Sequence, residues 1–361
     1  MKKQVMLGMS GGVDSAVAAL LLKEQGYDVF GVTLRLFDGE RACGSADEAE
    51  DARRVAALLG ISHETVALGE CFRSEVMDRF AESYIKGITP NPCIDCNRYI
   101  KFGKMLAYAE AHATDCIATG HYARIERDVN GRYLLKKAAD AHKDQTYVLY
   151  ALTQHQLAHT LFPLGDYRKE EIRRIAEEKG FINAHKRDSQ DICFVPDGDY
   201  AAFLQRYTGR SYPEGNFLDL DGKVVGQHQG AVRYTLGQRK GLYLGGRKGD
   251  DEGGRWFVVR KDLKNNILYV SHGDESPLYS KSCEVSGFNW IPEKPQKTEF
   301  DCMAKFRYRQ PDQPVHVSVK QGGGLHVEFV DKQRAVTEGQ YAVLYDGINC
   351  LGGGVIESAE Y

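Results

Sequence analysis

The chain has 361 residues, a length that excludes a mini-protein or a single peptide-binding module and predicts two or three domains. Its apolar fraction of 42% and charged fraction of 27% exclude wholesale disorder. A formal net charge of −3 disfavours a general binder of polyanions, so any contact with nucleic acid must come from a local patch. No run approaches the roughly 18 apolar residues of a membrane helix, and no secretory apolar core precedes Asp14. We therefore expect no membrane association and a cytoplasmic location.

Strand-like and helix-like segments alternate in the first part of the chain. Spacing and composition predict strands at residues 5–9, 27–36, 65–68 and 115–119, and helices at residues 13–25, 46–59, 72–85 and 100–112. Strands that alternate with helices form a parallel sheet covered on both faces. An Asn130-Gly131 turn between two apolar stretches predicts a hairpin inserted after that sheet.

The texture changes after about residue 207, where glycine-rich turns separate short strands. Strands are predicted at residues 256–260, 267–270, 316–319, 326–330 and 342–345, with a linker around Pro292 and Pro295. We therefore expect an α/β domain over residues 1–206, a small mostly-β central domain over residues 207–275 and a C-terminal β-barrel over residues 276–361.

The sharpest local signal is Ser-Gly-Gly-Val-Asp-Ser at residues 10–15, between the first strand and the first helix. The two glycines let backbone N–H groups approach a phosphate, and the helix start adds its partial positive charge. Ser10 and Ser15 can add hydroxyl donors, and Asp14 is suited to Mg²⁺. The loop is neither a Walker loop nor a dinucleotide loop. The alternative is an ordinary helix start capped by Ser10.

These six residues resemble the pyrophosphatase loop of ATP enzymes that adenylate a substrate and release pyrophosphate. The resemblance implies that the α/β domain is a nucleotide-binding domain of the PP-loop ATP pyrophosphatase type, with ATP as cofactor.

The chain has nine cysteines, an odd number and too few for a disulfide scaffold, which indicates buried, catalytic or metal-binding thiols. Cys93 and Cys96 form a C-x-x-C that fits a redox pair, half of a zinc site or iron–sulfur ligands. The prolines beside it, Pro90 and Pro92, favour an exposed, stiff loop. Cys193, taken alone, is a small buried hydrophobe, and the same holds for Cys43, Cys71, Cys116, Cys283, Cys302 and Cys350.

Several longer motifs together resemble the tRNA-specific 2-thiouridylase family (MnmA/TrmU). They are G-M-S-G-G-V-D-S, N-P-C-I-D-C-N-R-Y-I-K-F, A-T-G-H-Y-A, K-D-Q-T-Y-V-L, D-S-Q-D-I-C-F, Y-T-L-G-Q-R-K-G-L and F-R-Y-R-Q-P, in consistent order over nearly the whole chain. The family implies ATP-dependent thiolation of C2 of the wobble uridine in tRNAs for lysine, glutamate and glutamine. It also implies two partners, tRNA and a sulfur-donor protein, which is either a relay protein or a cysteine desulfurase.

The resemblance assigns site residues by matched motif. Residues expected to bind ATP are Gly8, Met9, Ser10, Gly11, Gly12, Val13, Asp14 and Ser15 at the phosphates, with Leu34 and Gly120 against the adenosine. Residues expected to contact tRNA are Asn91, Pro92 and Cys93 at the target base, and His121, Lys143, Asp144, Gln145, Arg307, Tyr308 and Gln340 elsewhere. Without the motifs, Lys143 and Arg307 would be ordinary solvated charges and His121 an ordinary histidine at a sheet end.

The chemistry that the family implies needs two cysteines. The C2 oxygen of uracil is a poor leaving group, and adenylation by ATP lets it depart with AMP. A persulfide on Cys193 then attacks C2, and Cys96 attacks that persulfide to release the sulfur, so two cysteines far apart in sequence must meet in space. The base must also leave the anticodon stack, which predicts that loop contacts hold the RNA.

The chain departs from the family at Cys93, where many members carry an aspartate that is a candidate general acid or base. Asp95 is not at the matching position and does not inherit that role. The substitution creates three candidate thiolates, Cys93, Cys96 and Cys193, enough to hold a four-iron cluster with one iron open to sulfide. The persulfide route and the cluster route both stay open at this stage.

Two other classes of function compete with thiolation. One is another adenylating enzyme with the same loop, such as an amidotransferase-type synthetase, which needs neither paired cysteines nor a C-terminal barrel that contacts RNA. The other is a non-catalytic RNA-binding protein with a decayed nucleotide fold, which the intact loop with Asp14 disfavours. Dependence of pyrophosphate release on tRNA separates thiolation from both. The sequence does not identify the sulfur donor or the oligomeric state.

Overall fold

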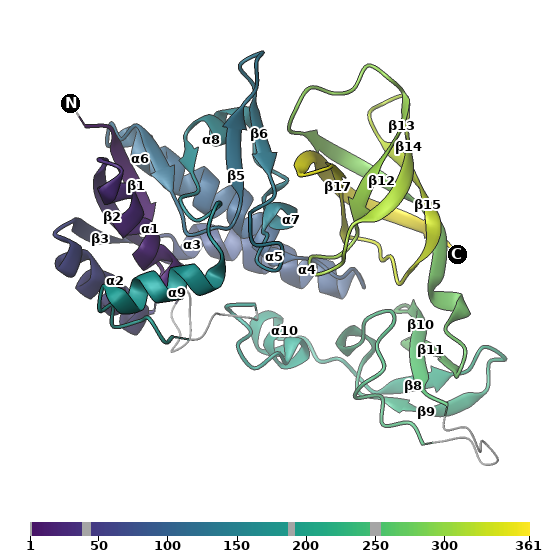
Figure 1. The fold of residues 1–361 in the computed structure, drawn as a ribbon. Coiled ribbons are helices and arrows are strands. Elements are labelled where there is room, and N and C mark those ends of the chain that lie inside the picture. The colour runs from purple at the N-terminus through teal and green to yellow at the C-terminus, as the bar shows by residue number, and fades with distance from the viewer. Residues whose placement is uncertain (1, 38–44, 187–191, 246–253) are drawn as a thin grey trace.

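The computed structural model describes residues 2–37, 45–186, 192–245 and 254–361 (Figure 1). The first unit is built on a parallel sheet in the order β3-β2-β1-β4-β7. Its strands are β1 (Gln4–Gly8), β2 (Asp28–Arg35), β3 (Ser62–Ala67), β4 (Cys116–Ala118) and β7 (Thr160–Leu161). The predicted parallel sheet is therefore confirmed.

Helices cover both faces of this sheet because neighbouring side chains of a strand point to opposite sides. Val5 and Leu7 of β1 pack with the helices α1 (Val13–Glu24), α2 (Ala46–Leu59) and α9 (Lys169–Glu178), while Met6 packs on the other face with α6 (Met105–Ala111). Gly60 ends α2 in the left-handed conformation at φ 63°, as the sequence predicts.

A helical layer beyond the sheet carries the C-x-x-C. Its helices are α3 (Gly69–Phe72), α4 (Arg79–Ile85), α5 (Pro92–Asp95), α7 (Thr146–Leu149), α8 (Gln154–Ala158) and α10 (Tyr200–Thr208), with π-helical segments at Arg73–Asp78 and Cys96–Lys104. The expected loop around the C-x-x-C is wrong. Pro92 occupies the first helical position, where its missing N–H costs nothing, and the Asn91 side chain caps this start. Cys93 therefore lies in α5, and Cys96 begins the π-helical segment that continues it.

The second half of the described chain is β-rich, as predicted. The central unit has the sheet order β10-β11-β8-β9, with β8 (Gly215–Leu218), β9 (Val224–His228), β10 (Trp256–Asp262) and β11 (Ile267–His272). The last unit has β12 (Tyr279–Trp290), β13 (Glu299–Lys305), β14 (Gln313–Val319), β15 (Leu325–Arg334), β16 (Tyr341–Asp346) and β17 (Asn349–Glu360). Pairing of β12 with β17 closes it into the predicted barrel. Short 3₁₀ turns lie at Ala231–Arg233 and Ser276–Leu278.

The predicted hairpin forms from β5 (Arg124–Arg127) and β6 (Tyr133–Lys136), and it joins the barrel instead of standing alone. Cys350 of β17 pairs with Leu135 of β6, and the Lys137 N–H donates to the Ile348 carbonyl. The first and last units therefore share one continuous sheet (Figure 1). None of the helices in the four described ranges is long and apolar enough to cross a membrane. The exact limits between the three units stay a prediction.

We expect Leu135→Ala to lower the free energy of unfolding by about 2–5 kcal/mol, because Leu135 is fully buried in the core that joins the hairpin to the barrel. Val129→Ala in the exposed tip of the same hairpin is the control and should change it by less than about 0.5 kcal/mol. Calorimetric melting of both variants measures the difference. Equal melting temperatures for the two variants would contradict the described pairing.

Candidate active site

The glycine loop between β1 and α1 needs glycine at two places. Gly11 has φ +69°, and a Cβ there would lie 2.4 Å from the Glu48 carbonyl oxygen. A Cβ on Gly120, which follows β4, would lie 3.0 Å from backbone atoms of Asp14 and Ser15. The left-handed φ and the neighbouring Glu48 therefore require glycine at residue 11, and the close approach of the segment after β4 to the loop requires it at residue 120.

The start of α1 has no side-chain cap. Gly12 occupies the N-cap, so the alternative in which Ser10 caps the helix is wrong. The Ser15 hydroxyl accepts from the Ser10 N–H at 3.2 Å and donates to the Gly12 carbonyl at 3.1 Å, which braces the loop internally. A helix start without a side-chain cap presents N–H groups and a positive dipole end, the arrangement that binds phosphate.

Asp14 is paired with a residue that the sequence analysis missed. The Lys169 ammonium lies 2.7 Å from both Asp14 carboxylate oxygens, and the Tyr122 hydroxyl donates to one of them at 2.8 Å. Lys169 is only 7% exposed. This cation therefore balances the charge of the Asp14 carboxylate. The lysine also places a positive charge beside the phosphate-binding loop.

Two further side chains hold the loop from the segment after α9. Asn183 donates to the Gly11 carbonyl at 3.1 Å, and its own buried carbonyl oxygen has no hydrogen-bond partner among the described residues. Lys186 bonds the same Gly11 carbonyl at 3.4 Å and pairs with Asp51 at 3.0 Å. The Lys186 ammonium and the buried amide oxygen of Asn183 therefore lie at the glycine loop, although no sequence motif indicated either residue.

Three other residues that were expected to bind ATP or tRNA, Met9, Leu34 and His121, are buried or partly buried. Met9 is 2% exposed and its N–H bonds the Val32 carbonyl, while Leu34 is partly buried in β2. His121 is buried between the Phe102 and Phe162 rings and bonds Thr119 at 2.6 Å. Burial holds the pKa of His121 well below its ordinary value, so the ring is neutral. Contact of His121 with RNA stays a prediction.

The two cysteines expected to react belong to one apolar cluster. Cys96 is 9% exposed within it, and Cys193 packs against it from a segment far along the chain. Phe72, Phe80 and Phe194 form its aromatic centre. Cys71 also packs against this cluster, a position that its sequence context did not indicate. Cys93, one turn earlier on the helix, is exposed.

The cysteines do not form an iron–sulfur site in this conformation. Within the described ranges, no three His, Cys, Asp or Glu side chains are grouped so that they could hold a metal ion. Three thiolates that bind one cluster must converge, and these side chains do not.

Asp95, between the two cysteines of the motif, has its pKa raised to about 6 by burial, although Arg79 and Arg98 oppose the shift.

Residues expected to contact tRNA gather where the C-x-x-C helix meets the barrel. The Gln340 side chain donates to the Thr89 carbonyl, just before that helix. Tyr308 is hydrogen-bonded to Gln145, and burial and the nearby Asp144 and Cys93 raise its pKa. Cys93, Gln145 and Tyr308 therefore lie together, although they come from three separate motifs.

Other members of that set have structural partners. The Arg307 guanidinium donates to the Ala335 carbonyl at 2.9 Å, and burial lowers its pKa. Asp144 is 8% exposed and accepts hydrogen bonds from the Ala138 N–H at 3.0 Å and the Thr146 hydroxyl at 2.7 Å. Burial raises the pKa of Asp144. Lys143 is partly buried in the turn before it.

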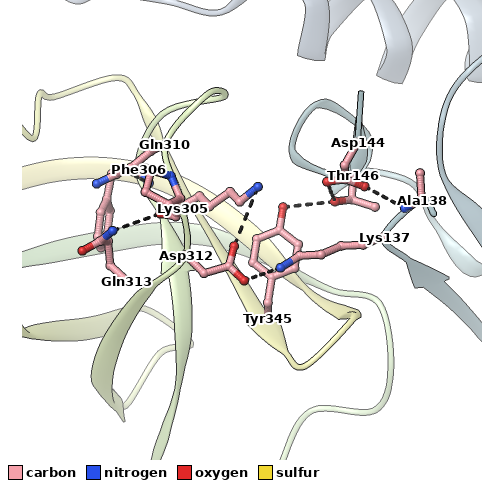
Figure 2. Close-up of polar contacts among 11 residues, drawn as sticks. Lys137, Ala138, Asp144, Thr146, Lys305, Phe306, Gln310, Asp312, Gln313 and Tyr345 are labelled. Atoms are coloured by element: carbon pink, nitrogen blue, oxygen red, sulfur yellow. Dashed lines mark hydrogen bonds and ion pairs between the residues drawn. The ribbon is translucent and has the colours of Figure 1, made fainter. Parts of the chain in front are cut away.

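Figure 2 shows how these contacts continue into the barrel. The hydroxyls of Thr146 and Tyr345 lie 3.2 Å apart, and Lys137 stacks on the Tyr345 ring at 4.2 Å. Asp312 pairs with Lys137 and with Lys305, the latter at 3.7 Å. Asp144 is thus one end of a polar network that joins the first unit to the barrel.

The chain is similar to known proteins over nearly its whole length. The family model "tRNA methyl transferase HUP domain" matches residues 3–197, "tRNA methyl transferase PRC-barrel domain" matches residues 201–272 and "Aminomethyltransferase beta-barrel domain" matches residues 280–356. A protein of Clostridium acetobutylicum named tRNA-specific 2-thiouridylase MnmA is 45% identical over 99% of this chain and 100% of its own. The chain belongs to the tRNA-specific 2-thiouridylase family. A Treponema denticola member is 46% identical over 99% of this chain and 98% of its own.

A solved structure of similar fold adds little to this family assignment. The U34-tRNA thiolase NcsA from Methanococcus maripaludis, solved with its [4Fe-4S] cluster, has a TM-score of 0.36 and 19% identity over 57% of this chain and 67% of its own. A likeness this low carries no inference about the cysteines of this thiouridylase-family chain.

We expect Asp14→Ala to lower both AMP formation and stability, the latter by about 1–3 kcal/mol, because it leaves the Lys169 ammonium buried without its carboxylate. The double variant Asp14→Ala/Lys169→Met should regain stability and stay inactive. Thermal melting and AMP release measure the two effects. Glu24→Ala, which removes the exposed partner of Lys179, is the control. A fully stable but inactive Asp14→Ala would instead make Asp14 a residue of ligand binding alone.

Proposed function

We propose that the chain is a tRNA-uridine 2-sulfurtransferase that uses ATP to thiolate C2 of the wobble uridine in tRNAs for lysine, glutamate and glutamine. Relatives at 45% identity over the full length carry the name of that activity. The observation that carries the proposal is that Cys96 and Cys193, from distant segments, pack around one apolar cluster. Neither an amidotransferase-type synthetase nor a passive RNA-binding protein needs that arrangement.

In the first step, the uracil C2 oxygen attacks the α-phosphate of ATP and pyrophosphate leaves. The N–H groups at the start of α1 bind the phosphates, and Lys169 supplies a positive charge next to them. Leu34 and Gly120 line the adenosine. Asp14 holds Lys169 in place, and its carboxylate is the group that would hold Mg²⁺. Bound Mg²⁺ would neutralise phosphate charge.

In the second step, the terminal sulfur of a Cys193 persulfide attacks C2, and AMP leaves with the former C2 oxygen. The Cys96 thiolate then attacks the inner sulfur of Cys193, the S–S bond of the persulfide breaks, and the thiocarbonyl stays on the uridine. Cys96 and Cys193 end as a disulfide, which a cellular thiol reductant must reduce before the next turnover. A cytoplasmic sulfur-donor protein reloads Cys193.

The target base is held where the C-x-x-C helix meets the barrel. Asn91, Pro92 and Cys93 face the uridine, and Gln145, Tyr308 and Gln340 close the same junction. Tyr308 is 36% exposed and offers a ring on which a splayed base can stack. Lys143 and Arg307 contact the RNA, and His121 and Asp144 support that surface from inside the fold.

We expect wild-type protein, supplied with tRNA, ATP and a persulfide donor, to release AMP and pyrophosphate and to form 2-thiouridine, with no AMP in the absence of tRNA. Cys193→Ser and Cys96→Ser should abolish 2-thiouridine, because each lacks one half of the sulfur transfer. Cys93→Ser should keep most activity. Cys302→Ser, on β13 of the barrel, is the control. Nucleoside mass spectrometry measures the product.

Three results would contradict this account. Release of ADP and phosphate would overturn the role assigned to the glycine loop. Activity that needs anaerobic iron reconstitution and is lost equally with Cys93, Cys96 or Cys193 would overturn the persulfide route. Release of pyrophosphate without tRNA would favour a small-molecule synthetase.

A further inference from the structure

A cleft of about 650 Å³ lies where all three units meet, and neither the glycine loop nor a cysteine lines it. The end of α4 supplies Lys86, β10 and the turn after it supply residues 259–264, and the barrel supplies residues 336–338 (Figure 1). Its volume falls within the roughly 300–1,000 Å³ of small-molecule sites. The proposed function uses none of these residues.

The cleft is lined by more cations than anions. Lys86, Arg260, Lys261 and Lys264 stand against Asp262 and Glu338. Both carboxylate oxygens of Asp262 accept hydrogen bonds from Asn265, at 3.1 and 2.8 Å, so this acid is turned into its own loop. Glu338 is exposed. Neither acid forms an ion pair with a lining lysine or arginine among the described residues.

Lys261 is the most informative member of the cleft. Its ammonium donates to the Gly87 carbonyl at 3.2 Å and forms no ion pair with a carboxylate of the described residues. Burial lowers the pKa of Lys261 to about 8, with no neighbouring anion to oppose the shift. The Arg260 guanidinium, also in the wall of the cleft, lies over the Tyr269 ring at 3.6 Å. A desolvated ammonium in a cleft that more cations than anions line favours binding of an anion.

We propose that this three-unit cleft binds a phosphate group through Lys261. Because each unit contributes to the walls of the cleft, a bound phosphate holds the central unit and the barrel in one arrangement relative to the first unit. The phosphate comes either from the backbone of tRNA, in which case the inference rests on the proposed function, or from a free phosphate or pyrophosphate.

Acetylation of lysines near pH 8 by N-acetoxysuccinimide, read by peptide mass spectrometry, reports the site directly. We expect tRNA to protect Lys261 more than Lys223, an exposed lysine of the same unit outside the cleft. Protection by tRNA but not by millimolar inorganic phosphate identifies a backbone phosphate. Protection by inorganic phosphate or pyrophosphate alone identifies a free anion. The proposal is overturned if neither tRNA nor phosphate protects Lys261 from acetylation more than it protects Lys223.

Substitution separates binding from folding. In the backbone case, Lys261→Met should weaken tRNA binding about tenfold and reduce the slope of log affinity against log salt by about 1, whereas Lys223→Met should change neither. Lys261→Arg, which keeps the positive charge, should restore both the tRNA affinity and the salt slope. If Lys261 acted only through the packing of its methylene stem, the charge would not matter. Thiolation by wild-type protein is measured in parallel. If that fails while phosphate still protects Lys261, the proposed function is wrong and the anion site stands.

Discussion

Backbone pairing of β6 with β17 makes the β5–β6 hairpin of the first unit and the barrel parts of one sheet. The proposed RNA site depends on this pairing. Together with the bond from Gln340 to the Thr89 carbonyl, this pairing fixes the barrel residues Tyr308 and Gln340 relative to the C-x-x-C helix. Sheet hydrogen bonds fix both distance and register. The central unit takes no part in this sheet, since its four strands form a sheet of their own.

A half-buried polar network reinforces the pairing. Lys137 and Lys305 share the carboxylate of Asp312 beside the Tyr345 ring, and Tyr345 leads through Thr146 to Asp144 (Figure 2). Such a network is stable only when its members are satisfied, because an unpaired buried charge is costly. Gln145, the residue after Asp144, is hydrogen-bonded to Tyr308 of the barrel. The same network explains why Asp144, expected at the RNA, is instead buried.

Local sequence predicted most of the fold and part of the site, for physical reasons that differ by element. The period of apolar residues predicted the parallel sheet, and Gly60 predicted the end of α2. The role of the glycine loop came from the resemblance of Ser-Gly-Gly-Val-Asp-Ser to the pyrophosphatase loop. The C-x-x-C was misplaced in a loop because Pro92 suits a helix start as well as a turn. Lys169 was missed because it stands at the first position of α9, where a lysine resembles an ordinary solvated charge, and only tertiary packing buries it. Pairing of β6 with β17 has no local signal at all.

The central claim is that ATP activates the C2 oxygen of the wobble uridine so that sulfur can replace it. Transfer of that oxygen can be followed with tRNA that carries ¹⁸O at O2 of the wobble uracil, during a single turnover with ATP and a persulfide donor. The account predicts that the AMP released with each 2-thiouridine carries the ¹⁸O label, as measured by mass spectrometry of AMP. Formation of 2-thiouridine with unlabelled AMP would contradict it.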